Sequence, residues 1–339
     1  EAAILARRGV GVDNNPVAVE LGRTLLEPVS VREFDRTATA IVDATLQEYG
    51  DLYETRCRSC NTATALRSVG YEAAEPKEVR YRCGACGSRG AAPPSEHDLV
   101  RMGRQPEFAY TAPDEDIYFG WEMQKLRRAG VTRWSELFTH RNLAVASFLI
   151  GRINETKNNA VRHWLRITFT SALAQFTKMI ADFSGRAGGP SWKLNCYWMP
   201  DKWQELNPVH YFANRIKKTC SALRELSALP CKWGADSRVE LGDSRDLNLE
   251  SDSVDYIFTD PPYGGEGIQY GELSMLWGLW LGHAHRLDSE IAFNPYRSFD
   301  QTHYERGLSA VFGEAARVLK PGKWMTVAFA NKDPDVWDA

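Results

Sequence analysis

Several features that mark whole classes of protein are missing from this sequence. There is no signal peptide at Glu1 and no apolar run of membrane-spanning length, so we expect a cytoplasmic protein without a membrane partner. A Gly-x-Gly-x-x-Gly loop, which would cradle the phosphates of a dinucleotide, is also absent ahead of Asp13. What is present is a chain of 339 residues, 43% of them hydrophobic, which is enough for a soluble globular protein of about two domains.

The most informative stretch is Asp260-Pro261-Pro262-Tyr263, which follows the short apolar run 254–258. Such a run predicts a buried strand, and two prolines cannot continue it, so the chain must turn there. An acid, a rigid turn and an aromatic ring would then stand at the carboxyl end of a strand, where open α/β sheets bind ligands. A turn that merely ends the strand and exposes a tyrosine is the alternative interpretation.

This motif resembles the catalytic motif of S-adenosylmethionine-dependent amino-methyltransferases, which methylate exocyclic amines of nucleobases. The lone pair of such an amine is delocalised into the ring, so the amine is a poor nucleophile until acceptors on its N–H groups localise it. By resemblance, the acceptors are the Asp260 carboxylate and the Pro261 carbonyl, and Pro261 and Pro262 hold both in place before the base arrives. Tyr263 would stack on a base flipped out of its helix.

Two further strands are predicted to end beside acids. Residues 9–12 lead to Asp13, and an acid after the second strand of a dinucleotide-type fold binds ribose hydroxyls. An N-cap for the helix that begins near Pro16 is the alternative role of Asp13 and fits the same fold. Residues 239–242 lead to Asp243, which by resemblance contacts the adenine of S-adenosylmethionine. The candidate cofactor residues are thus Asp13, Asn14, Asp243 and Ser244.

The chain after the motif follows the order expected for these enzymes. Apolar residues recur at threes and fours from Leu308 to Leu319, which predicts a helix. The segment 320–322, Lys-Pro-Gly, would end the helix, and residues 324–329 predict the next strand. A helix, Leu-Lys-Pro-Gly and a strand are the usual sequel to the catalytic strand in the family.

Four cysteines form two Cys-x-x-Cys pairs, Cys57 with Cys60 and Cys83 with Cys86, with 22 residues between the pairs. This spacing is typical of a zinc ribbon, in which each pair supplies two thiolates to one tetrahedral metal. Four thiolates leave no open position, so the zinc would be structural, and it would suit a reducing cytoplasm. Disulfides or redox pairs are the alternatives, although the partner signals of a thioredoxin-like site are absent.

A zinc ribbon between the ribose acid and the Asp-Pro-Pro-Tyr motif is similar to the arrangement in zinc-ribbon-containing adenine-specific DNA methylases. Segments 11–18, 197–200, 212–215 and 270–274 carry the same likeness, which covers most of the chain. The resemblance implies S-adenosylmethionine as cofactor and DNA as partner, and it identifies no restriction or defence-system partner. These enzymes place a glycine-rich loop before the position of Glu1, so we expect a fragment cut at both ends.

The net charge of −3 hides an asymmetry along the chain. Residues 121–220 carry 16 Lys and Arg against 6 Asp and Glu, whereas residues 231–300 carry 5 against 13. The basic stretch also contains Trp134, Trp164 and Trp203, so it suits either a DNA-contacting surface with stacking platforms or a solvated helical face over an aromatic core. The arginines expected to contact phosphates are Arg127, Arg128, Arg133, Arg162 and Arg166.

We therefore predict an α/β protein with a Rossmann-like class I methyltransferase sheet interrupted by a long insert. The sheet would comprise residues 1–30 and the catalytic part 233–339, and the insert would comprise 31–120, with the zinc ribbon at about 55–90, and the basic, mostly helical 121–232. The predicted reaction is methyl transfer from S-adenosylmethionine to adenine N6 in DNA. Methylation of RNA, cytosine N4 or guanine N2 is the alternative reaction, and a catalytically silent nucleic-acid-binding module is the alternative outside enzymes.

Overall fold

The computed structural model describes residues 2–5, 7–118, 120–182, 196–229, 236–264 and 268–330. The chain divides into two compact units. Unit 1 comprises residues 1–26, 119–124 and 234–339, and unit 2 comprises residues 27–118 and 125–233. The boundary predicted at 232–233 lies outside the described residues.

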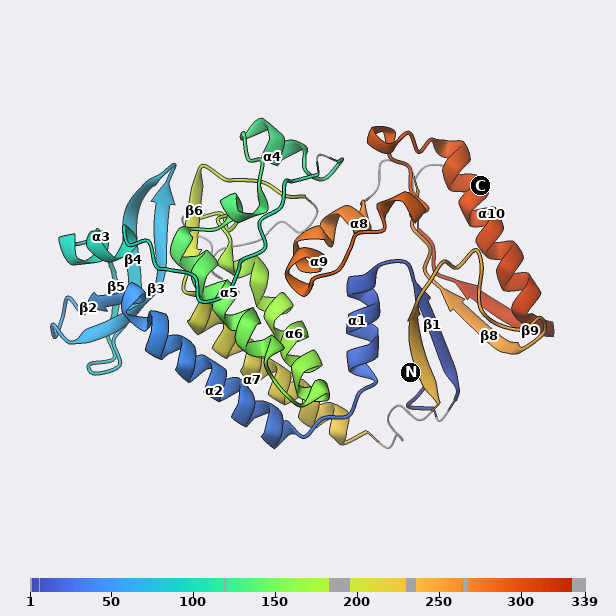
Figure 1. Cartoon of the computed structure of the whole chain (residues 1–339), viewed down its shortest axis with the longest axis horizontal. Helices are drawn as coiled ribbons and strands as arrows, with labels where there is room; N and C mark the ends of the chain where they lie inside the picture. Colours follow the sequence, from blue (N-terminus) through green and yellow to red (C-terminus); the bar gives the residue numbers. More distant parts are fainter. Residues whose placement is uncertain are drawn as a thin grey trace. The chain divides into compact units, whose positions relative to one another are not determined.

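The described residues of unit 1 form four strands, each of which has a parallel neighbour. Its elements in chain order are β1 (Gly9–Asp13), α1 (Pro16–Leu25), β7 (Ser237–Leu241), β8 (Val254–Thr259), α8 (Tyr270–Leu273), α9 (Met275–Leu281), η4 (Leu287–Ser289), η5 (Pro295–Arg297), α10 (Gln301–Val318) and β9 (Leu319–Val327). Strand β1 pairs with β7 along its whole length, and β8 pairs with β9. Among the described residues the two pairs are separate sheets (Figure 1). The α/β class is therefore confirmed, whereas one continuous Rossmann-like sheet stays a prediction.

Two helices of unit 1, α1 and α10, begin at side-chain caps that the sequence supplies. Asn15 accepts a hydrogen bond from the backbone N–H of Val17, and Pro16 occupies the first helical position of α1. Asp300 caps α10 in the same way through the N–H of His303. The cap of α1 is thus Asn15 and not Asp13, which was the alternative role considered for Asp13.

The helix predicted from Leu308 to Leu319 is longer at its start, because α10 begins at Gln301. Its buried face includes Tyr304 and Leu308, one turn apart. Strand β9 begins at Leu319, so the Lys-Pro-Gly segment 320–322 lies inside the strand and does not precede it. The pairing of β8 with β9 jumps from Val254–Leu319 to Tyr256–Trp324. The residues of β9 between Leu319 and Trp324 therefore bulge out of the ladder, and Gly322 among them has φ +74°.

Unit 2 combines an antiparallel sheet with a group of helices. Its elements in chain order are α2 (Val31–Tyr49), η1 (Gly50–Tyr53), β2 (Glu54–Arg56), β3 (Ala63–Glu72), β4 (Glu75–Arg82), β5 (Arg89–Ala92), α3 (Glu96–Met102), α4 (Gln124–Arg128), η2 (Trp134–Leu137), α5 (His140–Asn154), α6 (Asn159–Leu173), η3 (Ala174–Phe176), β6 (Lys202–Leu206) and α7 (Pro208–Ser227). The sheet runs β2-β3-β4-β5, and β6 joins it beside β3. The segments predicted as zinc ribbon and as helical insert therefore share this unit.

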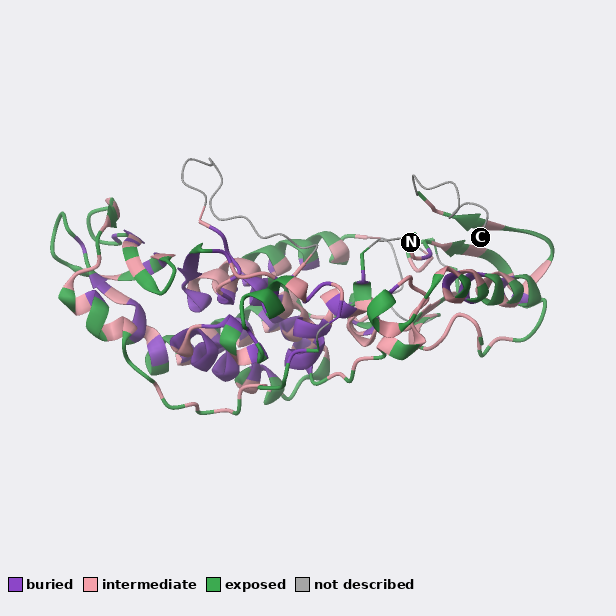
Figure 2. Cartoon of the chain, turned by 90° about the horizontal axis from the view of Figure 1, so that it is seen from above, coloured by how far each residue is buried: buried purple, intermediate pink, exposed green. Residues whose placement is uncertain are grey.

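The core of unit 2 lies among α2, α5, α6 and α7 (Figure 2). Helix α5 is buried on nearly every side between Arg141 and Ile150, as expected for a helix surrounded by others. Arg141 and Glu205 of β6 form an ion pair with side chains exposed by only 2% and 1%. Arg141 also donates to the carbonyl of Leu52 at 2.7 Å, so this pair ties α5 to the sheet and to η1.

Candidate active site and candidate metal centre

The Asp-Pro-Pro-Tyr segment leaves the sheet at the carboxyl end of β8. Thr259 is the last residue of the strand, and its carbonyl accepts a hydrogen bond from the N–H of Ala328, which follows β9. The next residue is Asp260, so its carboxylate stands where the ladder ends. This is the position that the apolar run and the two prolines predicted.

Tyr304 of α10 holds this turn through two contacts. Its hydroxyl donates a hydrogen bond to the Pro262 carbonyl at 2.7 Å. Its ring lies against Gly264, where an added Cβ would meet the ring at 2.7 Å. Gly264 has φ +72°, a conformation that glycine adopts without the strain of a side chain. The sequence patterns did not single out Tyr304, and its only local signal was a place on the apolar face of α10.

The two functional side chains of the motif lie next to each other. The hydroxyl of Tyr263 forms a hydrogen bond with the Asp260 carboxylate, which raises the pKa of Tyr263. The ring of Tyr263 meets Phe329 edge to face, with centroids 5.6 Å apart. The side chain remains 37% exposed, so part of the ring is open to stacking.

The candidate cofactor residues lie at the ends of the other parallel pair. Strand β1 ends at Asp13 and β7 at Leu241, and the N–H of Gly242 donates to the Asp13 carbonyl at 3.0 Å. Asp13 and Asp243 are therefore brought close by neighbouring strand ends. The Asp13 carboxylate accepts a hydrogen bond from the N–H of Asn15 at 2.7 Å, and burial raises the pKa of Asp13.

Side chains that no sequence pattern identified surround this second group. Arg245 binds Asp243 with its guanidinium, Nη2 lying 2.6 Å from Oδ2, and these hydrogen bonds lower the pKa of Asp243. Arg245 also donates to the Ser289 carbonyl at 3.2 Å, while the Ser289 hydroxyl donates to Asn14 Oδ1 at 2.8 Å. Ser244 lies in the turn between Asp243 and Arg245. One network thus joins Asn14 to Asp243 through Ser289 and Arg245.

A cavity of about 460 Å³ adjoins Arg245. Its charged and titratable lining consists of Arg245, Asp300, His303 and Arg306. The last three come from the cap and the first two turns of α10. This hollow, beside the residue that holds Asp243, is large enough for part of a small organic ligand.

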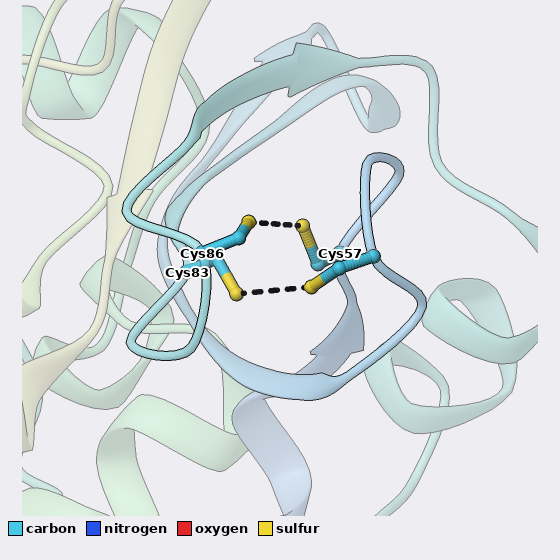
Figure 3. A group of neighbouring side chains, drawn as sticks. Cys57, Cys83 and Cys86 are labelled. Carbon is cyan, nitrogen blue, oxygen red and sulfur yellow. Dashed lines mark hydrogen bonds between the residues drawn. The ribbon is translucent and has the colours of Figure 1, made fainter.

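The four predicted metal ligands come together between two loops of the unit 2 sheet. Cys57 and Cys60 lie between β2 and β3, and Cys83 and Cys86 lie between β4 and β5. All four Sγ atoms are within 4.8 Å of one another, so the group could bind a metal ion such as zinc. Figure 3 shows Cys57 facing Cys83 and Cys86 across the space between the loops.

The two cysteine loops have the same backbone design. In the first loop the N–H of Cys57 donates to the Thr62 carbonyl, and the N–H of Asn61 donates to the Cys57 carbonyl. In the second loop Cys83 and Gly87 make the equivalent bonds, with Ser88 in the place of Thr62. Asn61 and Gly87 both have positive φ, at 58° and 73°. Asparagine and glycine are the residues that adopt this conformation most readily.

The spacing of the sulfur atoms fits a tetrahedral metal. A metal with bonds of about 2.3 Å to each sulfur requires sulfur atoms about 3.8 Å apart. The Sγ atoms of Cys57 and Cys86 are 3.7 Å apart, and those of Cys60 and Cys83 are 3.6 Å apart. A disulfide would require about 2.05 Å, and all four cysteines are free. The geometry therefore favours a metal site over the disulfide alternative.

Polar and aromatic neighbours support the cysteine group. The Ser88 hydroxyl lies 3.2 Å from Cys57 Sγ and lowers the pKa of that thiol to about 5. Tyr81 packs with Cys57 and Cys83, and its hydroxyl accepts a hydrogen bond from the N–H of Arg58 at 2.7 Å. The Arg58 side chain binds the fully buried Asp98 of α3. The first loop is thus anchored both to the sheet and to α3.

The structure separates the basic stretch into buried and exposed parts. Trp134, Trp164 and Trp203 are exposed by only 2%, 4% and 6%, so these three belong to the core and are not stacking platforms. Arg133 is exposed but contacts Asp114 and Asp116, each at 3.0 Å, which compensates its charge. Among the other predicted phosphate contacts, Arg127 and Arg128 are exposed on α4, and Arg162 and Arg166 lie on α6, where each donates to a neighbouring asparagine.

No helix in the described part of the chain is both long and apolar enough to span a membrane. The chain matches no protein-family model, no curated protein and no solved structure.

Proposed function

We propose that this protein transfers a methyl group from S-adenosylmethionine to adenine N6 in DNA, in the manner of the zinc-ribbon-containing adenine-specific DNA methylases. The observation that carries the proposal is the place of Asp260 and Tyr263. They stand together at the carboxyl end of a strand in a parallel pair. Asp13 and Asp243 follow the carboxyl ends of a second parallel pair, and such strand ends are the ligand-binding edge of open α/β sheets.

The chemistry required of the motif is to localise the lone pair of the amine. Asp260 accepts one N–H of the flipped base, and the Pro261 carbonyl accepts the other. Tyr304 already engages the Pro262 carbonyl, which supports Pro261 as the second acceptor. When bound, S-adenosylmethionine supplies an electrophilic methyl group on a sulfonium. Both acceptors are held before the base arrives, so little reorganisation is needed during the reaction.

The contact between Tyr263 and Asp260 exists before the base binds, so base binding would replace the partner of the Asp260 carboxylate. The tyrosine hydroxyl occupies the carboxylate that the amine would use. Entry of the base would replace this hydrogen bond with one from the amine and would leave the ring free to stack. Because one hydrogen bond is exchanged for another, the carboxylate keeps a donor throughout, and the exchange costs little free energy.

The remaining residues serve the cofactor and the zinc ribbon. Asp13 and Asn14 would bind the ribose hydroxyls, and Asp243 and Ser244 would contact the adenine. The Arg245 guanidinium would then share Asp243 with the adenine amine. The four cysteines would hold a structural zinc, which suits a cytoplasmic protein because thiolates stay reduced there.

Methyl incorporation from labelled cofactor, followed by nucleoside analysis, tests the proposal. We expect N6-methyladenine, and Asp260→Ala should lower the rate by about 10²–10³-fold because it removes a preorganised acceptor. Asp255→Ala, on the same strand, is the matched control, since its carboxylate pairs with Lys320 on the surface. Methyl groups only on cytosine N4, guanine N2 or RNA would replace the substrate, and no methyl transfer despite DNA binding would favour a silent binding module.

Salt dependence tests the DNA partner separately. Removal of one side chain that neutralises a phosphate should reduce the slope of log affinity against log salt concentration by about 1. We expect this change for Arg128→Ala, because Arg128 is exposed on α4. Arg133→Ala should leave the slope nearly unchanged, because two aspartates already compensate that charge. Equal slopes for both variants and the wild type would exclude α4 from the DNA-binding surface.

A further inference from the structure

We propose that Tyr304 is the positioning residue of the Asp-Pro-Pro-Tyr turn, setting where Tyr263 stands for base capture. The inference rests on the proposed methyl transfer for its catalytic meaning. It rests on the contacts of Tyr304 for its structural basis: a hydroxyl 2.7 Å from the Pro262 carbonyl and a ring packed against Gly264.

The backbone of the turn has one torsion that its own sequence leaves open. The ring of each proline fixes φ at Pro261 and Pro262. A following proline also restricts ψ, so Asp260 and Pro261 are held in extended conformations. Pro262 is followed by Tyr263, and its ψ therefore lacks this restraint. That torsion decides where the Pro262 carbonyl points and where the chain continues, and the hydrogen bond from Tyr304 fixes it.

The second contact acts on the other side of Tyr263. Gly264 takes a left-handed conformation, and the Tyr304 ring fills the space that a Cβ would occupy. Tyr263 is thus held between two backbone positions that touch the same side chain. The direction of its ring towards Asp260 and Phe329 follows from these two contacts.

Tyr304 is itself rigidly placed. Its side chain is fully buried and packs with Leu308, while Ile291, Phe312 and Phe329 lie against the same cluster. Burial raises the pKa of Tyr304 to about 12, so the hydroxyl remains a donor at any ordinary assay pH. Phe329 touches both the Tyr304 cluster and the ring of Tyr263, which connects the support to the residue it positions.

The variant that isolates the hydrogen bond is Tyr304→Phe, which keeps the ring and removes the hydroxyl. Tyr256→Phe is the matched control, because the Tyr256 hydroxyl donates to Thr326 across the same strand pair at 2.6 Å and does not touch the turn. The first measurement is the NMR order parameter of the Tyr263 and Gly264 amides in this chain. We expect both to fall from rigid to flexible values in Tyr304→Phe only, and unchanged order would overturn the proposal.

The second measurement is single-turnover methyl transfer by the protein. One net hydrogen bond corresponds to about a three- to tenfold loss of rate in Tyr304→Phe. If Tyr304 only stabilised the fold, the loss of rate in Tyr304→Phe would not depend on the residue at position 263. We therefore also combine Tyr304→Phe with Tyr263→Ala. The combined loss should be smaller than the product of the single losses, and independent losses would contradict a positioning role. An inactive wild type would refute the proposed function, whereas an active wild type with an equally active Tyr304→Phe would refute this inference alone.

Discussion

Replacing Gly264 by alanine should disturb the candidate active site more than replacing a glycine that has the same φ but open space where a Cβ would be added. Gly264 and Gly282 have the same φ of +72°. A Cβ added at Gly264 would lie 2.7 Å from the Tyr304 ring, whereas a Cβ at Gly282 would meet nothing within 4 Å. The pair therefore separates the cost of backbone conformation from the cost of the clash with Tyr304.

The structure sets the size of the difference. Both variants place an alanine in the left-handed region, at a cost of about 1–2 kcal/mol each in the free energy of unfolding. Gly264→Ala adds a contact that real Cβ atoms essentially never show, and overpacking of this kind costs about 1–3 kcal/mol more. The Tyr304 ring is fully buried and packs with Leu308, so we expect relief to come from displacement of the turn.

Urea unfolding and the methyl-transfer assay measure the two consequences. We expect Gly264→Ala to be the less stable variant and to lose activity, while Gly282→Ala loses stability alone. Combining Gly264→Ala with Tyr304→Leu removes the ring, so the double variant should be destabilised by less than the sum of the single changes. Equal unfolding free energies for the two glycine variants, together with normal activity of Gly264→Ala, would refute the packing described for the turn.

Three further predictions concern the metal, the buried ion pair and acid stability. Elemental analysis should find about one zinc per chain, and Cys57→Ser should lose it. The control Cys220→Ser should retain the zinc, because it alters a buried thiol outside the group of four. Disulfides in the native protein without metal would contradict this prediction. Glu205→Gln should lower the free energy of unfolding, measured by urea titration, by about 3–5 kcal/mol, because Arg141 is left buried without its counter-charge. A loss below ~1 kcal/mol would contradict this prediction and indicate that water solvates the Arg141 guanidinium. Hydrogen bonds from Arg317 and the Leu247 backbone lower the pKa of Glu314 to about 2 from its ordinary 4.5, so its stabilising effect is complete above that ordinary value and is lost as pH falls towards 2. Glu314→Gln should therefore flatten the fall in melting temperature between pH 5 and pH 2, and parallel curves would contradict it.

Local patterns in the sequence were enough to locate where β1 and β8 end and where the two cysteine loops lie. The apolar runs before Asp13 and Asp260 predicted strands that the structure contains, because a run of apolar residues followed by a turn signal is typical of a strand. The prediction that the run before Asp260 is buried was wrong, since Tyr256 and Phe258 of β8 are 55% and 65% exposed. The cysteine spacing predicted two loops that meet, because each Cys-x-x-Cys pair can supply two thiolates to one tetrahedral metal. The membership of the strands in a methyltransferase sheet and the reaction itself remain predictions from resemblance.

Tertiary structure alone decided what surrounds these positions. Tyr304 reaches Pro262 from 42 residues away, and Ser289 reaches Asn14 from 275 residues away. Trp134, Trp164 and Trp203 are buried although they lie in a basic stretch, and Arg133 is compensated by acids 17 and 19 residues earlier. The physical reason is that periodicity reports which face of an element is apolar, whereas burial and hydrogen-bond partners depend on which other element that face meets. Such pairings arise from packing between distant segments, and no local pattern encodes them.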